Sequence, residues 1–421
     1  MQFQFRTAGQ LVFGRGEHRK AGACAASVGR RVLLVTGASS LAHSGVLAAL
    51  LADLRERLEH VEHVTVAGEP DVAQADALSR QCRESGCGVV LAIGGGSVLD
   101  VGKAVAALSQ NEGSAIEYLE DVGRGAPRPL AQNPLPIIAL PTTAGSGSEV
   151  TRNSVLRVPD LRVKRSLRSD LLLPRVAIVD PDLLRGAPLR VAAAAGMDAL
   201  THLIEAYLSK GAQPITDALC LRGIELLWPA LHELARRHTP GVHAGGPVVP
   251  DTLHEDLALA SLWGGIVLAN AGLGAVHGLV APLGGQCGVA HGDGCACLLP
   301  ATFRANAQAL LRRQAGAPAI ARLRGLLRLL GDAREDLDLV VGRLSTLRQR
   351  LGILSLAEQG VGQDQFASII AQSRGGSMRS NPVELSDDEL LDVLIQSHRT
   401  DPAAADRSAG LTAAQAPREM A

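Results

Sequence analysis

The first 180 residues alternate short, largely apolar segments of β type with helix-forming stretches, and this alternation limits the fold more than any other feature. Helices between consecutive strands are the connections that a parallel sheet requires. Such a sheet is covered on both faces, which explains why its strands are apolar runs. The expected strands are residues 32–36, 61–66, 89–93, 136–140 and 176–179. We also expect a small edge pair formed by residues 3–5 and 11–13.

The pattern changes after Asp180-Pro181, where helical periodicity prevails as far as Ser397. We therefore expect an α/β domain at residues 1–185, an all-helical domain at 186–399 and a disordered tail at 400–421. Residues 240–250, with their Gly and Pro, are expected to form a loop between helices.

Composition excludes several classes of function. A formal net charge of −1 and only two Trp, two Tyr and five Phe argue against a nucleic-acid partner. The N-terminus lacks the basic and apolar regions of a secretory signal, and seven cysteines without CxxC spacing fit reduced thiols in the cytoplasm. Residues 257–292 contain no Asp, Glu, Lys or Arg, but we expect a helix buried in a soluble core there and no membrane partner.

Two glycine-rich loops each follow an expected strand. Residues 94–97 read Gly-Gly-Gly-Ser and open a helix, so backbone N–H groups and the positive helix end would face a phosphate. A tight strand-to-helix connection without a ligand is the alternative at that loop. Residues 141–149 read Pro-Thr-Thr-Ala-Gly-Ser-Gly-Ser-Glu, at the strand end where open α/β sheets bind ligands. Two such loops on one sheet indicate a nucleotide cofactor.

Four side chains in the second half are candidate metal ligands. Asp198 and His202 are four residues apart in a helical pattern and therefore share a face. His277 and His291 flank the turn-rich run 282–288, which we expect to bend the chain back so that both imidazoles face one point. Each histidine alone is more typical of a buried core residue, but one carboxylate with three imidazoles suits Fe(II) or Zn(II).

These segments together resemble the iron-containing (group III) alcohol dehydrogenase family, in the family's order and over about residues 1–400. The motifs that carry the resemblance are Gly94-Gly95-Gly96-Ser97 with Asp100 and Lys103, residues 141–149, Gly196 to His202 with Glu205-Ala206-Tyr207, Gly274 to Gly278 through His291-Gly292, and Asn381-Pro382 with the acidic helix start after it.

The resemblance implies an N-terminal α/β dinucleotide-binding domain, an all-α metal-binding domain of the dehydroquinate synthase-like fold, and an active site between them. It also implies hydride transfer between nicotinamide and a small alcohol or carbonyl compound, with a metal that polarises the substrate oxygen. The implied metal ligands, for Fe(II) or sometimes Zn(II), are Asp198, His202, His277 and His291. The implied residues around NAD or NADP are Gly37, Gly95, Gly96, Ser97, Asp100, Thr142, Thr143, Ser146 and Lys164.

The sequence departs from the family at two places. Many members carry a second histidine, linked to proton transfer, four residues after the third ligand, and here that position is Ala281. No catalytic proton carrier is therefore assigned. Some members have an Asp after the first main strand that repels a 2′-phosphate, and here Gly37 stands there, followed by Ser39 and Ser40, which could bind a phosphate. NADP(H) thus remains open beside NAD(H).

Three functions are compatible with these sequence features. The first is an alcohol or aldehyde oxidoreductase, with a maleylacetate-reductase-like oxo-acid reductase as a variant. The second is a dehydroquinate-synthase-type lyase, although the segments around the metal ligands contain few basic residues. The third is a non-catalytic protein that retains the fold. Cys287 and Cys295 are expected to be core or pocket residues, and the chain is expected to form a homo-oligomer, most simply a dimer.

Overall fold

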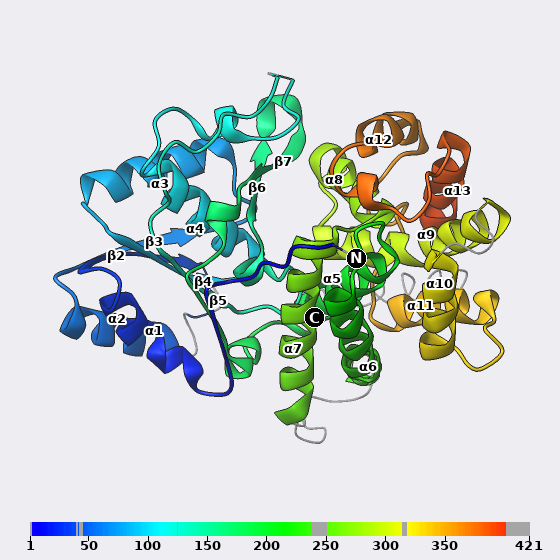
Figure 1. Cartoon of the computed structure of the whole chain (residues 1–421), viewed down its shortest axis with the longest axis horizontal. Helices are drawn as coiled ribbons and strands as arrows, with labels where there is room; N and C mark the ends of the chain where they lie inside the picture. Colours follow the sequence, from blue (N-terminus) through cyan, green and yellow to red (C-terminus); the bar gives the residue numbers. More distant parts are fainter. Residues whose placement is uncertain are drawn as a thin grey trace, which may run out of the picture.

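The computed structural model describes residues 2–38, 41, 45–123, 125–237, 251–313 and 318–400. They form two halves that lie side by side, a sheet with helices on both faces and a bundle of helices (Figure 1). The expected fold class, α/β first and all-helical second, is confirmed.

The N-terminal half is built on a six-stranded sheet in the order β1-β8-β5-β4-β2-β3, and every neighbouring pair is parallel. Its strands are β1 (Gln10–Phe13), β2 (Arg31–Gly37), β3 (His60–Val66), β4 (Val89–Gly94), β5 (Ile137–Pro141) and β8 (Val176–Val179). All five segments expected to be the main strands are confirmed. The strands β2, β4, β5 and β8 are buried apolar runs, as in a doubly covered sheet, whereas the edge strand β3 is largely unburied.

Four helices cover the two faces of this sheet. They are α1 (Ala21–Ala26), α2 (Val46–Arg57), α3 (Val72–Glu84) and α4 (Gly96–Leu108). Side chains alternate along a strand, so Leu34 of β2 packs in the core under α1 and α2, whereas Leu33 packs in the core under α3 and α4. Pairing of Thr36 with Ile93 and of Gly94 with Pro141 makes β2, β4 and β5 end level. The loops that follow these strands therefore lie along one edge of the sheet.

Two local features differ from the sequence expectations. The prediction of an edge pair at the N-terminus is wrong, because β1 pairs with β8 in parallel and residues 3–5 are not a strand. The open edge of β8 offers unpaired backbone groups that β1 satisfies. An unexpected antiparallel hairpin, β6 (Asn153–Val158) and β7 (Val163–Arg168), follows β5. Its basic residues hide the alternation that would otherwise indicate strands.

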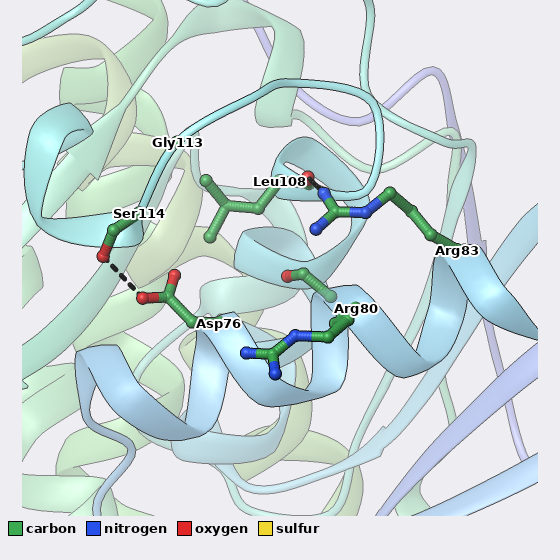
Figure 2. Close-up of a pocket in the computed structure, with 7 residues that line it drawn as sticks. Asp76, Arg80, Arg83, Leu108, Gly113 and Ser114 are labelled. Atoms are coloured by element: carbon green, nitrogen blue, oxygen red, sulfur yellow. Dashed lines mark hydrogen bonds between the residues drawn. The ribbon is translucent and has the colours of Figure 1, made fainter.

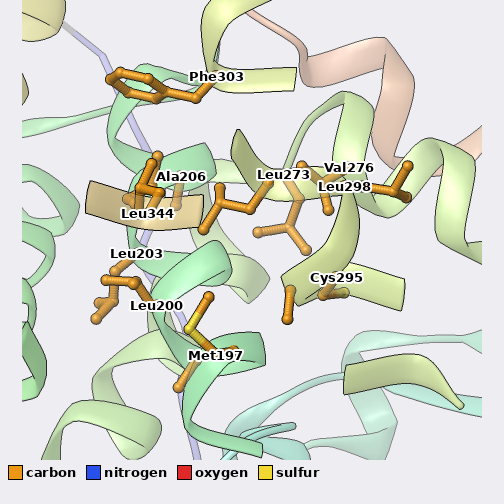
Figure 3. Packing of buried hydrophobic residues seen from close by; sticks show 14 of the residues in the cluster. Met197, Leu200, Leu203, Ala206, Leu273, Val276, Cys295, Leu298, Phe303 and Leu344 are labelled. Atoms are coloured by element: carbon orange, nitrogen blue, oxygen red, sulfur yellow. The ribbon is translucent and has the colours of Figure 1, made fainter. Parts of the chain in front are cut away.

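The C-terminal half is a helical bundle around α5, which is buried throughout from Gly196 to Leu208. In Figure 3, Met197, Leu200 and Leu203 of α5 belong to one apolar cluster with Leu298 and Leu344. The helices are α5 (Leu189–Leu208), α6 (Pro214–Arg237), α7 (Asp251–Ala271), α8 (Ala275–Cys287), α9 (His291–Arg313), α10 (Pro318–Leu330), α11 (Leu337–Arg350), α12 (Phe366–Ser373) and α13 (Asp387–His398).

The uncharged stretch at 257–292 spans three helices and not the single helix that we expected. The turn expected over 282–288 is also shorter: α8 continues through Pro282 to Cys287, and the chain turns at Gly288, which has a φ of 69°. Pro282 removes one helical hydrogen bond, but it is buried, so packing keeps the helix intact. Within the described residues no helix has by itself the length and apolar character of a membrane span, and the pair at 252–271 and 275–287 meets that test only jointly, across a bend of 101°.

The last strand ends at Val179 and α5 begins at Leu189. The domain limits given above stay predictions. The loop expected at 240–250 lies outside the described residues, as does the expected tail apart from Thr400.

Candidate metal and nucleotide site

Helix α5 presents three polar side chains, Asp198, His202 and Glu205, on one buried face. Their spacing of four and then three residues places them on adjacent turns of the helix. Apart from Thr201, most other residues here are apolar, so this polar stripe lies inside the bundle, with 4%, 2% and 5% of Asp198, His202 and Glu205 exposed. The Nε2 atom of His202 lies 3.6 Å from Oδ1 of Asp198.

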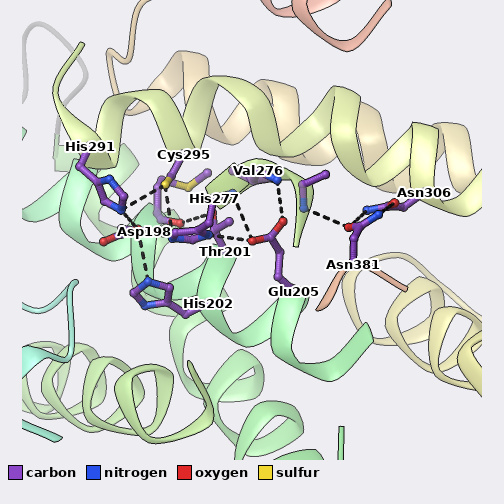
Figure 4. Close-up of polar contacts among 12 residues, drawn as sticks. Asp198, Thr201, His202, Glu205, Val276, His277, His291, Cys295, Asn306 and Asn381 are labelled. Carbon is purple, nitrogen blue, oxygen red and sulfur yellow. Dashed lines mark hydrogen bonds and ion pairs between the residues drawn. The ribbon is translucent and has the colours of Figure 1, made fainter. Parts of the chain in front are cut away.

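Two further imidazoles reach the same carboxylate oxygen from other helices. His277 is in the first turn of α8, and its Nε2 lies 3.3 Å from Oδ1 of Asp198. His291 is the first residue of α9, and its Nε2 lies 3.5 Å from the same oxygen. Figure 4 shows the three rings converging on Asp198. The structure thus brings together all four residues that the sequence proposed as metal ligands.

The electrostatics of this cluster favour a charged carboxylate. Burial by itself would raise the pKa of Asp198, but the three histidines around it lower that pKa far below its usual range. Burial lowers the pKa of His202 to about 3, although Asp198 acts in the opposite direction. A neutral imidazole keeps its lone pair, which is the form that binds a metal ion.

Glu205, which the sequence reasoning gave no role, holds His277 in place. Its Oε2 lies 2.7 Å from Nδ1 of His277, and its Oε1 accepts a hydrogen bond from the backbone N–H of Val276 at 2.7 Å. Asn381 accepts a further bond from the backbone of Ala275 at 3.0 Å. The first turn of α8 is therefore fixed, and Nε2 of His277 is directed at Asp198. The signal in the sequence was the spacing of Glu205, seven residues after Asp198.

Cys295 also lies in this cluster, although the sequence analysis set it aside. Asp198, His277, His291 and Cys295 each offer one ligand atom, and these four atoms lie within 4.8 Å of one another. The donor set of carboxylate oxygen, imidazole nitrogen and sulfur suits a transition-metal ion and not Mg²⁺ or Ca²⁺. The residues present therefore fit a divalent metal of the iron or zinc kind.

The two glycine-rich loops meet at the edge of the sheet. Gly96 opens α4, and a Cβ there would lie 2.7 Å from Oγ of Ser146 in the second loop. The backbone of Thr142 donates a hydrogen bond to the carbonyl of Gly94 at 2.9 Å. Oγ1 of Thr142 is buried and has no hydrogen-bond partner among the residues that the structure describes. Glycines, a free helix N-terminus and an unpartnered hydroxyl fit a bound dinucleotide.

The second loop is seated directly on the helical half. Gly147 has a φ of 59°, and a Cβ there would lie 2.3 Å from the Cα atom of Gly265 in α7. A Cβ on Gly145 would lie 2.9 Å from Ala195, three residues before Asp198 on α5. The absence of side chains at these glycines lets the second glycine-rich loop approach α7 and the part of α5 that carries Asp198.

Three other predicted cofactor residues lie at or beside the start of α4, whereas Asp100 is hydrogen-bonded within the protein. Gly95 caps α4, Ser97 follows in its first turn, and Thr143 lies beside Gly95. Both carboxylate oxygens of Asp100 are engaged within the protein, one by the Ser148 hydroxyl at 2.6 Å and one by the backbone N–H of Val155 at 3.0 Å. The structure thus gives Asp100 a role in fixing the second loop against α4.

Buried Lys103 supports the same loop. Its Nζ donates hydrogen bonds to the carbonyls of Ser148 at 2.9 Å and Asn153 at 2.5 Å. Beside it, burial raises the pKa of Glu149 to about 7, and Lys103 opposes that rise. The sequence placed both groups in the family motifs but gave neither of them a role.

The remaining residues that the sequence singled out are Gly37, Lys164 and Ala281. Gly37 ends β2, and Ser39 and Ser40 after it lie outside the described residues. Lys164 of β7 reaches α8, where it would touch a Cβ on Gly284, and pairs with Glu69 at 2.5 Å. Ala281 lies one turn after His277 on α8.

A separate pocket of about 230 Å³ lies between α3 and the start of the loop after α4 (Figure 2). It is lined by Asp76, Ser79, Arg80, Arg83, Leu108, Gly113 and Ser114. No predicted site residue lines it, so it plays no part in the site described above.

Comparisons with known proteins agree with this site. Residues 8–181 match the family model described as iron-containing alcohol dehydrogenase, and residues 192–398 match that of the Fe-containing alcohol dehydrogenase family, C-terminal. The chain is 35% identical to 1,3-propanediol dehydrogenase of Klebsiella pneumoniae, over 88% of this chain and 92% of the relative. It is 34% identical to 4-hydroxybutyrate dehydrogenase of Cupriavidus necator, over 87% and 92%.

A solved structure is similar over nearly the whole chain. Sulfoacetaldehyde reductase of Bifidobacterium kashiwanohense, in complex with NAD⁺, superposes with a TM-score of 0.80 at 30% identity, covering 95% of this chain and all of that one.

Proposed function

Because the chain belongs to the iron-containing alcohol dehydrogenase family, we propose that Asp198, His202, His277 and His291 hold its catalytic metal beside a nicotinamide nucleotide. The family makes the protein an NAD-dependent, metal-containing alcohol oxidoreductase. We propose that it interconverts a small alcohol and the corresponding aldehyde or ketone.

The observation that carries the proposal is the convergence of three imidazoles on Oδ1 of Asp198, at 3.3, 3.5 and 3.6 Å. A divalent ion held there would supply a Lewis acid that polarises the substrate oxygen. Asp198 offers the negative charge, and Glu205 fixes the ring of His277. The side chain of His291 is 45% exposed and so marks the side from which a substrate can approach.

The nucleotide side of the proposal rests on the two loops. Gly95, Gly96 and Ser97 would receive the pyrophosphate at the N-terminus of α4, and Thr142, Thr143 and Ser146 would line the nucleotide. NAD(H) is the proposed carrier. NADP(H) is proposed as a second carrier because Gly37 places no carboxylate at the end of β2 to repel a 2′-phosphate.

The substrate class is proposed from the relatives, which are named for 1,3-propanediol and 4-hydroxybutyrate. Both names describe short, flexible primary alcohols. Ala281 carries no exchangeable proton, so the substrate proton leaves by a route without a histidine at that position. A homodimer in the cytoplasm is proposed on the sequence expectations alone, and size-exclusion chromatography with light scattering tests the dimer.

The test uses the full chain reconstituted anaerobically with Fe(II) or Zn(II). Oxidation of primary alcohols and diols, and reduction of the matching aldehydes and oxo-acids, is measured with NAD(H) and NADP(H). We expect metal-dependent turnover that His277→Ala abolishes and that His232→Ala retains. His232 is a matched control because its ring packs against Trp228 on α6, outside the cluster. Metal-independent turnover, or equal activity in the two variants, would refute the proposal.

A further inference from the structure

We propose that Sγ of Cys295 is a further ligand of the metal held by Asp198 and the three histidines. This inference rests on the proposed function, because it assumes that a metal binds there. It adds sulfur to a set that the sequence analysis limited to oxygen and nitrogen.

The spacing of the ligand atoms fits a single ion bound by sulfur, nitrogen and oxygen. A tetrahedral ion with bonds of about 2.0–2.1 Å to nitrogen or oxygen and about 2.3 Å to sulfur holds its N and O ligands about 3.4 Å apart, and sulfur about 3.6 Å from nitrogen. Oδ1 of Asp198 lies 3.3 Å from Nε2 of His277 and 3.5 Å from that of His291. Sγ of Cys295 lies 3.6 Å and 3.8 Å from the same two nitrogens. These four distances match four of the six edges of a tetrahedron around one ion.

The position of Cys295 in the fold also directs its sulfur at the cluster. It lies one turn after His291 on α9, as His202 lies one turn after Asp198 on α5, so each helix directs two donors to the same point. Figure 4 shows the sulfur between the rings of His277 and His291. Cys295 is fully buried, so its thiol has these polar groups and not water as neighbours.

A cysteine nearby on the same helix shows the difference from an ordinary buried thiol. Cys297 is also buried, but its Sγ donates a hydrogen bond to the carbonyl of Ser397 at 3.3 Å, away from the cluster. Its neighbours include no such group of ligand atoms in the part of the chain that the structure describes. Cys297 is therefore a matched control.

A sulfur ligand changes which ions the site prefers. When the sulfur–metal bond forms, the thiol proton leaves to solvent and the thiolate becomes the ligand. Thiolate favours zinc and cobalt over harder ions such as Mn(II) and Mg(II).

The experiment is a titration of the metal-depleted full chain with Co(II) under anaerobic conditions. Cobalt bound by thiolate shows a sulfur-to-metal charge-transfer band in the near ultraviolet, separate from its visible bands. We expect this band in the wild-type protein and in Cys297→Ser. In Cys295→Ser we expect stoichiometric cobalt with its visible bands but without the charge-transfer band. Zinc affinity in that variant should fall by at least about tenfold.

The outcomes separate this inference from the proposed function. Stoichiometric cobalt in the wild-type protein without a charge-transfer band overturns the sulfur ligand and leaves the metal centre standing. A band that persists in Cys295→Ser also overturns it. Cobalt that does not bind at all, or binds equally in His277→Ala, overturns both proposals. If Cys295→Ser does not fold, Cys295→Ala takes its place, and absence of the band from the wild-type protein still overturns the sulfur ligand.

Discussion

Asp198 is a buried carboxylate, which a protein interior tolerates only when partners stabilise its charge. Three imidazoles and a cation supplied from outside meet that requirement. Burial acts to raise the pKa of Asp198, but the neighbouring histidines lower it by more, so the carboxylate is negatively charged. A negative, buried carboxylate of this kind fits the proposed role of Asp198 as a metal ligand.

Glu205→Gln should weaken metal binding without unfolding the protein. The carboxylate of Glu205 fixes the ring of His277, and loss of such an outer partner typically lowers metal affinity about 10- to 100-fold. Competition with a coloured chelator measures the affinity of each variant for Zn(II). Glu225→Gln is the control, because Glu225 is exposed and pairs with Arg222 in a surface contact. Equal zinc affinities in the two variants would exclude the proposed role of Glu205.

Glu149 should make stability depend on pH. Burial raises its pKa from 4.5 to about 7, so the folded state binds a proton that the unfolded state has already lost. Stability from this group is therefore full below about pH 4.5 and falls as the pH rises to about 7, by up to about 3 kcal/mol. Glu149→Gln removes this dependence.

Urea unfolding of the wild-type protein and Glu149→Gln across about pH 5 to 8 checks the sign. The free energy of unfolding of the variant, relative to the wild type, should increase with pH and level off above about pH 8. The exposed Glu56→Gln should show no such trend. A pH-independent difference between the wild type and Glu149→Gln would contradict the assignment.

At the scale of elements, the second glycine-rich loop contacts α7, and in the proposed site this contact would set how closely the nucleotide approaches the metal. Gly147→Ala should impair that contact twice, through a φ of 59° and through a Cβ 2.3 Å from Gly265. We expect a loss of more than about 2 kcal/mol in unfolding free energy and weaker NAD⁺ binding. Calorimetric titration with NAD⁺ measures the second effect.

Gly68→Ala isolates the backbone part of this prediction. Gly68 has a φ of 72°, but a Cβ there would meet nothing within 4 Å. Only the left-handed conformation should then be penalised, by about 1–2 kcal/mol. If the two variants bind NAD⁺ equally, the close approach at Gly147 does not position the nucleotide.

The elements differ in how far the sequence could predict them. The strands of the sheet were predictable because burial on both faces leaves a continuous apolar run, as in β4. The hairpin of β6 and β7 was not, since basic residues lie on both faces of Val163–Arg168 and interrupt the alternation of apolar and polar residues. The pairing of β1 with β8 was not either, because it joins segments that no local pattern connects.

The same limit applies to the site. The spacing of Asp198 and His202 was visible because both are on one helix. Cys287 and Cys295 stand equally far from His291 in sequence, and the fold alone distinguishes them. Gly288 ends α8 between Cys287 and His291, whereas α9 runs unbroken from His291 to Cys295. The geometry of that helix break cannot be derived from residue counting.

At the scale of the whole molecule, metal removal should lower thermal stability. An ion that binds only the folded state stabilises it by about 4 kcal/mol when its free concentration is about 1,000 times the dissociation constant. A chelator should therefore lower the midpoint of thermal unfolding of the metal-loaded protein by several degrees. His277→Ala should show no response to the chelator. Differential scanning calorimetry of both proteins, with and without chelator, is the measurement, and an unchanged wild-type midpoint would contradict the prediction.

Every proposed metal ligand comes from residues 198–295, and most of the proposed nucleotide contacts come from residues 37–146. The proposed nucleotide contacts and the proposed metal ligands therefore lie largely in two consecutive parts of the sequence. Glycines that touch α5 and α7 join the two parts, together with Lys164, which reaches α8. A chimera that joins the sheet half of one relative to the helical half of another would inherit its electron carrier from the first parent and its metal from the second. In such a chimera the two halves must still fit at the contact between Gly147 and Gly265, so these two glycines decide whether the two halves form a working enzyme.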